Sequence, residues 1–180
     1  TVSEDEHPRP QSTAEALAGL RPLFEGGVVT AGNASGINDG AAALIIGSRE
    51  AGERAGIKPR ARIVSAAIAG VSPRVMGLGP VLACEKALAR AGLGLNDMDV
   101  IEINEAFASV VLRYMQDLDL DPEVTNVNGG AIAMGHPLGA TGGCLVSTVL
   151  DELERRDAKR AMLSLCVGGG MGISTIIERV

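Results

Sequence analysis

Aromatic side chains are almost missing from this sequence of 180 residues, which contains two phenylalanines, one tyrosine and no tryptophan. Proteins that bind single-stranded nucleic acid stack the bases on aromatic rings, so this composition argues against that function. The net charge is −6 and the basic residues form no stripe, so the overall field attracts neither a phosphate backbone nor an anionic membrane. We therefore expect no nucleic-acid partner and no membrane partner.

Cysteines and long apolar runs are also scarce. The three cysteines, Cys84, Cys144 and Cys166, are an odd number, which argues against a disulfide framework, and they lack the CxxC spacing of a metal site. No apolar run approaches the roughly 20 residues that span a bilayer, and no export signal opens the sequence. A reducing compartment, the cytoplasm, fits best. An organelle signal stays compatible with the sequence if the natural N-terminus lies upstream.

Apolar residues are plentiful instead, at 46%, and they alternate between strand-like and helix-like segments. We expect strands at Ile63–Ala69, Val100–Ile103, Thr125–Val127, Ala161–Leu165 and Ile173–Ile177. Helices are expected from Pro80 to Gly92, after Asn104, and from Ala140 to Arg156. This alternation predicts an α/β fold with a mixed sheet that helices cover.

The first part of the chain carries weaker signals. Thr1–Gln11 is polar, and we expect an extended loop there with His7 facing solvent. Ser12 and Glu15 have the spacing of a capping box before a short helix. We also expect a strand at Ala41–Ile46 and a helix from Ser48 to Gly56.

One of the only two histidines, His136, lies in the glycine-rich stretch GGAIAMGHPLGATG directly before a helical run. Glycine relieves steric limits on the backbone, and Pro137 fixes the direction in which the chain leaves the turn. Imidazole exchanges protons near neutral pH, which suits an acid or a base in catalysis. The alternative is a histidine that only caps a turn.

Two further motifs follow strand-like segments. Cys166 opens the cluster CVGGGMG, where backbone amides next to a thiol suit the stabilisation of an oxyanion. The alternative for Cys166 is a small buried apolar residue. Asn104 and Glu105 open NEAFA, where an asparagine often simply caps the next helix. Glu105 is expected to bind local backbone or to orient a neighbouring residue, and Cys84 and Cys144 are expected to be structural.

The motifs NEAFA, GHPLGATG and CVGGGMG, in this order and preceded by TAGNASGINDGAAA and VMGLGP, resemble the C-terminal half of a thiolase. This family makes or cleaves 3-ketoacyl-CoA at a cysteine nucleophile. The resemblance implies a thiolase-like layered fold, with 1–37 as the end of a loop domain, 38–57 as the last elements of the N-terminal domain, and 58–180 as the C-terminal domain. The nucleophilic cysteine belongs to an N-terminal half without a counterpart here. We therefore expect the chain alone to be inactive and to expose apolar surface near Ala41–Ile46.

The resemblance also implies roles for the catalytic motifs. His136 would take the proton of the nucleophilic cysteine and form an oxyanion hole with a water held by Asn104. Cys166 would exchange the proton of the acetyl-CoA methyl group, and the Gly168 amide would contribute to a second oxyanion hole. The substrate contacts that the resemblance implies are Ser35, Ala34, Phe24, Met76, Ala106 and Phe107.

We accordingly predict an acyltransferase of fatty acid metabolism that uses CoA as a substrate and needs no cofactor. With its N-terminal half supplied it is expected to form a homo-oligomer. A condensing enzyme of the same superfamily is less favoured, because Cys166 and His136 occur together. A second class of function also fits the sequence, namely a non-catalytic acyl-CoA binding or assembly module derived from a thiolase.

Overall fold

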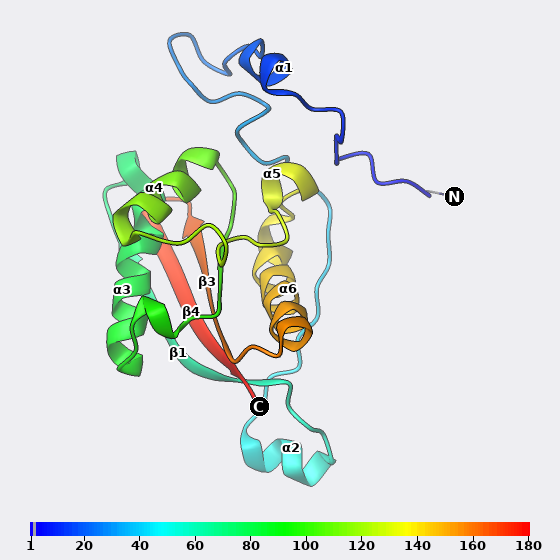
Figure 1. Ribbon diagram of the computed structural model, residues 1–180, viewed down its shortest axis with the longest axis vertical. Helices are drawn as coiled ribbons and strands as arrows, with labels where there is room; N and C mark the ends of the chain where they lie inside the picture. Colours follow the sequence, from blue (N-terminus) through cyan, green and yellow to red (C-terminus); the bar gives the residue numbers. More distant parts are fainter. Residues whose placement is uncertain (2) are drawn as a thin grey trace.

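A four-stranded mixed sheet forms the centre of the protein, as seen in a computed structural model that describes residues 1 and 3–180 (Figure 1). The strands lie in the order β1 (Ala61–Gly70), β4 (Met171–Arg179), β3 (Arg160–Val167) and β2 (Val100–Ile103). β4 pairs antiparallel with both β1 and β3, whereas β2 and β3 run parallel. The predicted mixed α/β sheet is therefore confirmed.

Helices cover both faces of this sheet. α3 (Gly79–Ala91) and α4 (Ala108–Leu118) lie on one face, and α6 (Thr141–Arg156) lies on the other (Figure 1). The remaining helical segments are α1 (Ala14–Ala18), α2 (Arg49–Ala55), η1 (Pro73–Leu78), η2 (Leu95–Asp97), α5 (Ala131–Met134) and η3 (Leu138–Ala140). We call residues 61–179 the body and residues 1–57 the arm.

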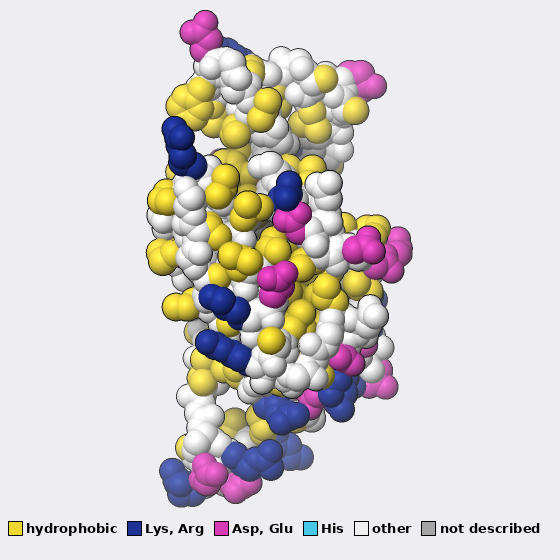
Figure 2. Space-filling view, turned by 90° about the vertical axis from the view of Figure 1, so that its left-hand side faces the viewer, with side chains coloured by type: hydrophobic (Ala, Val, Ile, Leu, Met, Phe, Trp, Pro, Cys, Tyr) yellow, Lys and Arg dark blue, Asp and Glu magenta, His cyan; other side chains and the backbone are white. Residues whose placement is uncertain are grey.

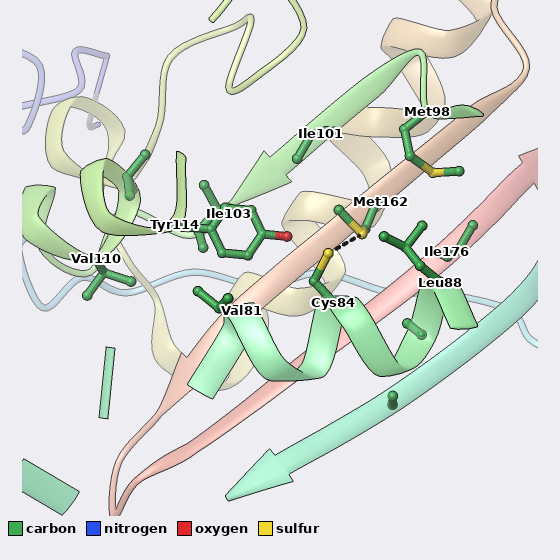
Figure 3. Packing of buried hydrophobic residues seen from close by; sticks show 13 residues of the cluster. Val81, Cys84, Leu88, Met98, Ile101, Ile103, Val110, Tyr114, Met162 and Ile176 are labelled. Carbon is green, nitrogen blue, oxygen red and sulfur yellow. Dashed lines mark hydrogen bonds between the residues drawn. The ribbon is translucent and has the colours of Figure 1, made fainter. Parts of the chain in front are cut away.

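The body has an apolar cluster on each face of the sheet. Side chains from β2 alternate between them, because successive strand residues point to opposite faces. Ile101 and Ile103 join the cluster under α3 and α4, whereas Val100 joins the cluster under α6. Figure 3 shows the first of these clusters, in which the buried Cys84 Sγ lies 3.3 Å from Met162 Sδ. Cys84 is thus structural, as predicted.

Helix ends follow the local signals in the sequence. The Ser48 side chain accepts a hydrogen bond from the Ala51 amide at the start of α2, which ends at Gly56. α3 ends at Gly92, whose φ of 66° is a left-handed conformation that favours glycine. At α1 the prediction was wrong by one residue, since Thr13 and not Ser12 provides the capping oxygen.

Other expectations for irregular segments were wrong. Ala41–Ile46 forms no strand; it is extended and exposed, and 92% of the surface of Ile45 is accessible. The predicted exposure of apolar surface there is confirmed. Thr125–Val127 forms isolated bridges instead of a strand. His7 does not simply face solvent, because its ring is half-buried against Asn38 and the Ile132 carbonyl.

One face of the molecule mixes apolar and charged surface. Apolar side chains spread over the middle of this face, and Lys and Arg gather toward its lower end, where α2 lies (Figure 2). The edge strand β1 exposes Ile63 and Ile68, of which 58% and 71% of the surface is accessible. No helix among the described residues is long and apolar enough to cross a membrane.

Candidate active site

The parallel strands β2 and β3 bring two of the predicted catalytic residues to the same edge of the sheet. Asn104 directly follows β2, and its backbone amide donates to the Ser164 carbonyl on β3 at 2.9 Å. Cys166 lies two residues after Ser164 near the end of the same strand. Because parallel strands end at one edge, residues that are far apart in sequence meet there.

His136 is connected directly to Asn104. The Asn104 Nδ2 atom lies 3.2 Å from His136 Nε2, and Asn104 itself is only 1% exposed. On the other side of the ring, His136 Nδ1 lies 2.6 Å from Thr141 Oγ1 at the start of α6. Asn104 therefore does not cap the next helix, where Phe107 is the N-cap residue. Two side chains on different elements fix the plane of the imidazole.

The backbone of the His136 turn is held by the arm. Asn38 Oδ1 accepts a hydrogen bond from the His136 amide at 3.0 Å. Gly135 adopts a φ of 99°, which side chains rarely permit, and a Cβ there would collide with Asn38. The Asn38 Nδ2 atom in turn lies 3.2 Å from His7 Nδ1. A residue of the arm thus positions the predicted base of the body.

Burial changes the acidity of both candidate acid–base groups. Loss of solvent lowers the pKa of His136 below its ordinary value of 6.5, so the ring is mainly neutral at pH 7. Burial also raises the pKa of the Cys166 thiol above its ordinary value of 9.0. At neutral pH the site therefore holds a neutral imidazole and a protonated thiol.

The turn after Cys166 is open at Gly168, whose amide is the predicted contributor to an oxyanion hole. Gly168 is exposed, and a Cβ placed on it would meet nothing within 4 Å. Gly170 is different: it is buried, its φ is 91°, and a Cβ there would collide with the Val71 carbonyl. The Gly170 carbonyl accepts from the Val71 amide at 2.7 Å, which anchors the turn while its tip stays accessible.

Four predicted substrate contacts come together where the arm crosses the NEAFA segment. The Ser35 amide donates to the Ala106 carbonyl at 3.0 Å, and Ala34 forms an antiparallel bridge with Phe107. The Ala108 amide also donates to the Asn33 carbonyl at 2.9 Å. Residues of the arm and residues of the body that are far apart in the sequence are thereby brought together close to Asn104.

The other two predicted contacts lie apart from this group. Met76 is half-buried in η1, which packs against α4, where Gly77 lies close to Val110. Phe24 is 74% exposed in a turn of the arm, closed by a bond from the Leu23 amide to the Val29 carbonyl. No hydrogen bond or bridge within the described residues links Phe24 to the catalytic group, so its role stays a prediction.

Glu105 supports the segment that leads to His136. Its Oε2 atom accepts from the Ile132 amide at 3.1 Å, and its Oε1 atom accepts from Asn126 Nδ2 at 3.4 Å. Glu105 thus binds backbone that lies 27 residues away and not local backbone, and its contact with the Asn126 side chain fits the alternative that it orients a neighbour. Asn126 also exchanges two hydrogen bonds with the backbone of Ile103, so its amide continues the sheet beyond β2.

Three residues that contact His136 or its loop were not predicted from the sequence. Thr141 was detectable, because a hydroxyl five residues after His136 starts the same helix. Asn38 and His7 had no local signal, since they approach His136 and its loop only through tertiary structure. The site as a whole combines a proton acceptor, a thiol, an amide and open backbone amides, which suits proton transfer next to a carbonyl.

Comparisons with known proteins agree with this chemistry. Residues 57–179 match the family model "Thiolase, C-terminal domain", and residues 1–50 match "Thiolase, N-terminal domain". The chain is 55% identical to acetyl-CoA acetyltransferase of Escherichia coli (strain K12), and the match covers 99% of this chain and 45% of that protein. The chain thus spans about 45% of the length of the curated relatives that it matches.

Solved structures show the same similarity. The crystal structure of Bacillus anthracis acetyl-CoA acetyltransferase superimposes with a TM-score of 0.94 at 49% identity, covering 98% of this chain and 45% of that chain. Human mitochondrial 3-ketoacyl-CoA thiolase in complex with CoA gives a TM-score of 0.91 at 49% identity, covering 99% and 46%. The predicted layered fold is therefore confirmed.

Proposed function

Because the chain belongs to the thiolase family, we propose that it is the C-terminal portion of an acetyl-CoA C-acyltransferase that moves acyl groups between thioesters. The observation that carries this proposal is the position of His136, fixed between Asn104 and Thr141 at the strand edge that also carries Cys166. CoA is the proposed acyl carrier and substrate, and a relative of known structure was solved with CoA.

His136 is the proposed base for the nucleophile. With its ring proton on Nδ1 toward Thr141, the ring keeps a lone pair on Nε2, which takes the proton of a cysteine thiol on the N-terminal half. The thiolate then attacks the acyl thioester, the C–S bond to CoA breaks, and the thiolate of CoA leaves with a proton. The lowered pKa of His136 keeps the ring neutral and ready for the first step.

Cys166 is the proposed acid–base group for the second substrate. Its thiolate removes a proton from the methyl group of acetyl-CoA, and the enolate attacks the acyl-enzyme. A C–C bond forms while the C–S bond to the nucleophilic cysteine breaks, and that cysteine leaves as a thiolate. In thiolysis the steps reverse, and the thiol returns the proton to the leaving enolate. The raised pKa of Cys166 favours the protonated thiol, which suits the reverse direction. His136 and a water held by Asn104 form the first proposed oxyanion hole, and the Gly168 amide contributes to the second.

The arm is the proposed contact for CoA. Ser35 and Ala34 lie on the segment that pairs with Ala106 and Phe107, so a ligand bound there lies next to the catalytic residues. Phe24 and Met76 remain proposed contacts of the ligand and the acyl group. The division into 1–37, 38–57 and 58–180 also remains a proposal, as does a homo-oligomer of the complete enzyme.

Thiolysis of acetoacetyl-CoA tests this function. We expect no turnover above background from the 180-residue chain, and turnover after the N-terminal half is supplied, covalently or in trans. Turnover by the chain alone would contradict the proposed need for an external nucleophile. Binding of acyl-CoA without turnover in the restored protein would instead favour a non-catalytic binding module.

A further inference from the structure

Two buried oxygen atoms on β2 and directly after it have no hydrogen-bond partner among the described residues. They are Glu102 Oε1 and Asn104 Oδ1, and their residues are 2% and 1% exposed. A buried acceptor without a partner costs free energy, so such atoms are uncommon in folded proteins. Glu102 has no part in the mechanism above, although only one residue separates it from Asn104.

Both side chains point to the face of the sheet that α6 covers. Alternation along β2 places Val100 in the cluster under α6 and Ile101 and Ile103 in the opposite cluster. Glu102 therefore shares the face of Val100, and Asn104, two residues further, shares it too. His136, which contacts Asn104, is held on this same side by Thr141 of α6. The two side chains are thus neighbours on one face of the sheet, and the Asn104 amide turns its Nδ2 atom toward the imidazole and its unpartnered Oδ1 atom away from it.

Two acceptors can bind each other only if one of them carries a proton. Burial, together with the negative charges of Glu105 and Glu152, raises the pKa of Glu102 to about 7. The cations on α6, Arg155 and Arg156, bind Glu152 instead of Glu102. Glu102 therefore holds a proton at neutral pH far more often than an exposed glutamate does.

We propose that Glu102 is a positioning residue for His136: its protonated carboxyl group donates, directly or through one water molecule, to Asn104 Oδ1 and thereby turns the Asn104 amide NH₂ toward His136 Nε2. Because Nε2 then faces a donor, it keeps its lone pair, and the ring proton stays on Nδ1 toward Thr141. This is the tautomer in which Nε2 accepts a proton.

Ionisation of Glu102 has the opposite effect. A carboxylate attracts the amide NH₂ of Asn104, which rotates and presents Oδ1 to His136. The ring must then carry its proton on Nε2, where it can no longer act as a base. Glu102 thus selects the tautomer of His136 through the orientation of one amide. This inference deepens the proposed function, since it explains how the proposed base is kept in its active form.

The tautomer can be measured in the 180-residue chain by ¹⁵N NMR of the imidazole rings. Only two histidines contribute signals, and His7→Asn assigns them. Between pH 6.5 and 8.5 the protonated fraction of Glu102 falls roughly 25-fold for a pKa of about 7. We expect the His136 ring to change over this range from the Nδ1–H form to the Nε2–H form.

Two variants of Glu102 test whether this position needs a hydrogen-bond donor or only a side chain of similar volume. Glu102→Gln has a permanent N–H donor, so we expect the Nδ1–H form at both pH values. Glu102→Leu has no donor, so we expect the preference and its pH dependence to disappear. Glu154→Gln removes a half-exposed carboxylate that binds Arg60 on the outer side of α6, and we expect it to behave like the unchanged chain.

A His136 tautomer that does not change with pH would overturn the proposal. So would identical tautomers in Glu102→Gln and Glu102→Leu, which would show that a donor at this position is irrelevant. The measurement needs no turnover, so it is independent of the proposed function. A protein without acyltransferase activity that still changes tautomer would refute the function and leave the role of Glu102 intact.

Discussion

The arm and the body carry similar local signals for helices and strands, but only the body forms a sheet with buried apolar clusters. The body has apolar clusters on both faces of its sheet, whereas no described residue of the arm is buried. Both regions nevertheless contain helices that end at a left-handed glycine, Gly56 after α2 in the arm and Gly92 after α3 in the body. The difference lies in tertiary partners, because capping is local whereas strand formation and burial require a second segment.

The comparison also shows where the two regions depend on each other. The arm touches the body through Asn33, Ser35 and Asn38, and these contacts lead to the NEAFA segment and to His136. The segment with the least burial thus supports the candidate site.

The largest effect on catalysis is expected when the proposed catalytic residues of the body are replaced. In the enzyme restored with its N-terminal half, His136→Ala should slow acylation of the nucleophile by about 100-fold or more for each role lost, as base and as oxyanion donor. Cys166→Ala should block condensation and thiolysis but leave slow acylation. Burst-phase acyl transfer followed by mass spectrometry separates these steps. Normal acylation by His136→Ala with none by Cys166→Ala would invert the assignment.

Ser35→Ala provides the comparison within the arm. If the arm binds CoA and the body performs the chemistry, this variant should raise the KM for CoA more than it lowers kcat. The effect of one lost hydroxyl contact is expected to be about 10-fold. Steady-state kinetics of the restored enzyme measure it. A loss of kcat as large as that of His136→Ala would place Ser35 in the chemistry instead.

Gly172→Ala should strongly destabilise the body. A Cβ at this position would overlap the backbone of Gly79 and Pro80, where β4 packs directly against the start of α3. Backbone cannot give way easily, so we expect a loss of about 3 kcal/mol in the free energy of unfolding. Denaturant unfolding followed by circular dichroism measures this loss.

Gly168→Ala is the matched control, because the space around Gly168 is open. We expect its stability to change by less than about 0.5 kcal/mol. Equal destabilisation by both substitutions would show that the close approach of β4 and α3 does not cause the loss of stability at residue 172.

The pH dependence of stability should carry a contribution from Glu102. Its folded pKa of about 7 exceeds the ordinary value of 4.5, so the folded state holds this proton more tightly than the unfolded state. The resulting stability is complete below pH 4.5 and is lost as pH rises through 7, by about 3 kcal/mol. Glu102→Gln should remove this loss, as thermal unfolding at pH 5 and pH 8 would reveal. Parallel pH profiles of both proteins would contradict it.

The smallest effect is expected at the junction itself. Asn38→Ala removes the acceptor of the His136 amide, which should loosen the arm by about 1 kcal/mol without unfolding the body. Hydrogen exchange at the His136 amide measures this loosening. Asn33→Ala is the control, because the hydrogen bonds that its side chain makes to described residues join it to Thr30 and Val28 of the arm. Faster exchange at His136 in both variants would mean that the arm acts as one unit.

Much of the body's fold could be predicted from sequence because its signals are local. Val100–Ile103 was predicted with correct bounds, and α3 was predicted to end at Gly92, as it does. Ala41–Ile46 was predicted as a strand because its apolar pattern is that of one, but the chain offers it no partner strand. Strand order was also beyond reach, since the antiparallel pairing of β1 with β4 joins the two ends of the body.

The candidate site divides in the same way. Motif residues such as His136 and Cys166 were identified because glycines surround them, and clusters of glycine are easy to detect in a sequence. Glu102 was missed because in sequence it is a single glutamate in an apolar run, and only its burial distinguishes it. Asn38 was missed because its contact with His136 spans almost a hundred residues.

The single tyrosine has a practical consequence for all of these measurements. Tyr114 is fully buried under α3 and contacts the Ser164 hydroxyl at 3.0 Å, and the chain contains no tryptophan (Figure 3). Its ultraviolet fluorescence therefore reports the state of the body alone and is blind to fraying of the arm. Burial also raises the pKa of this phenol well above its ordinary value. In alkali, the absorbance of the phenolate should therefore develop only as fast as the body unfolds. The rate of this absorbance change thus measures the unfolding rate of the body.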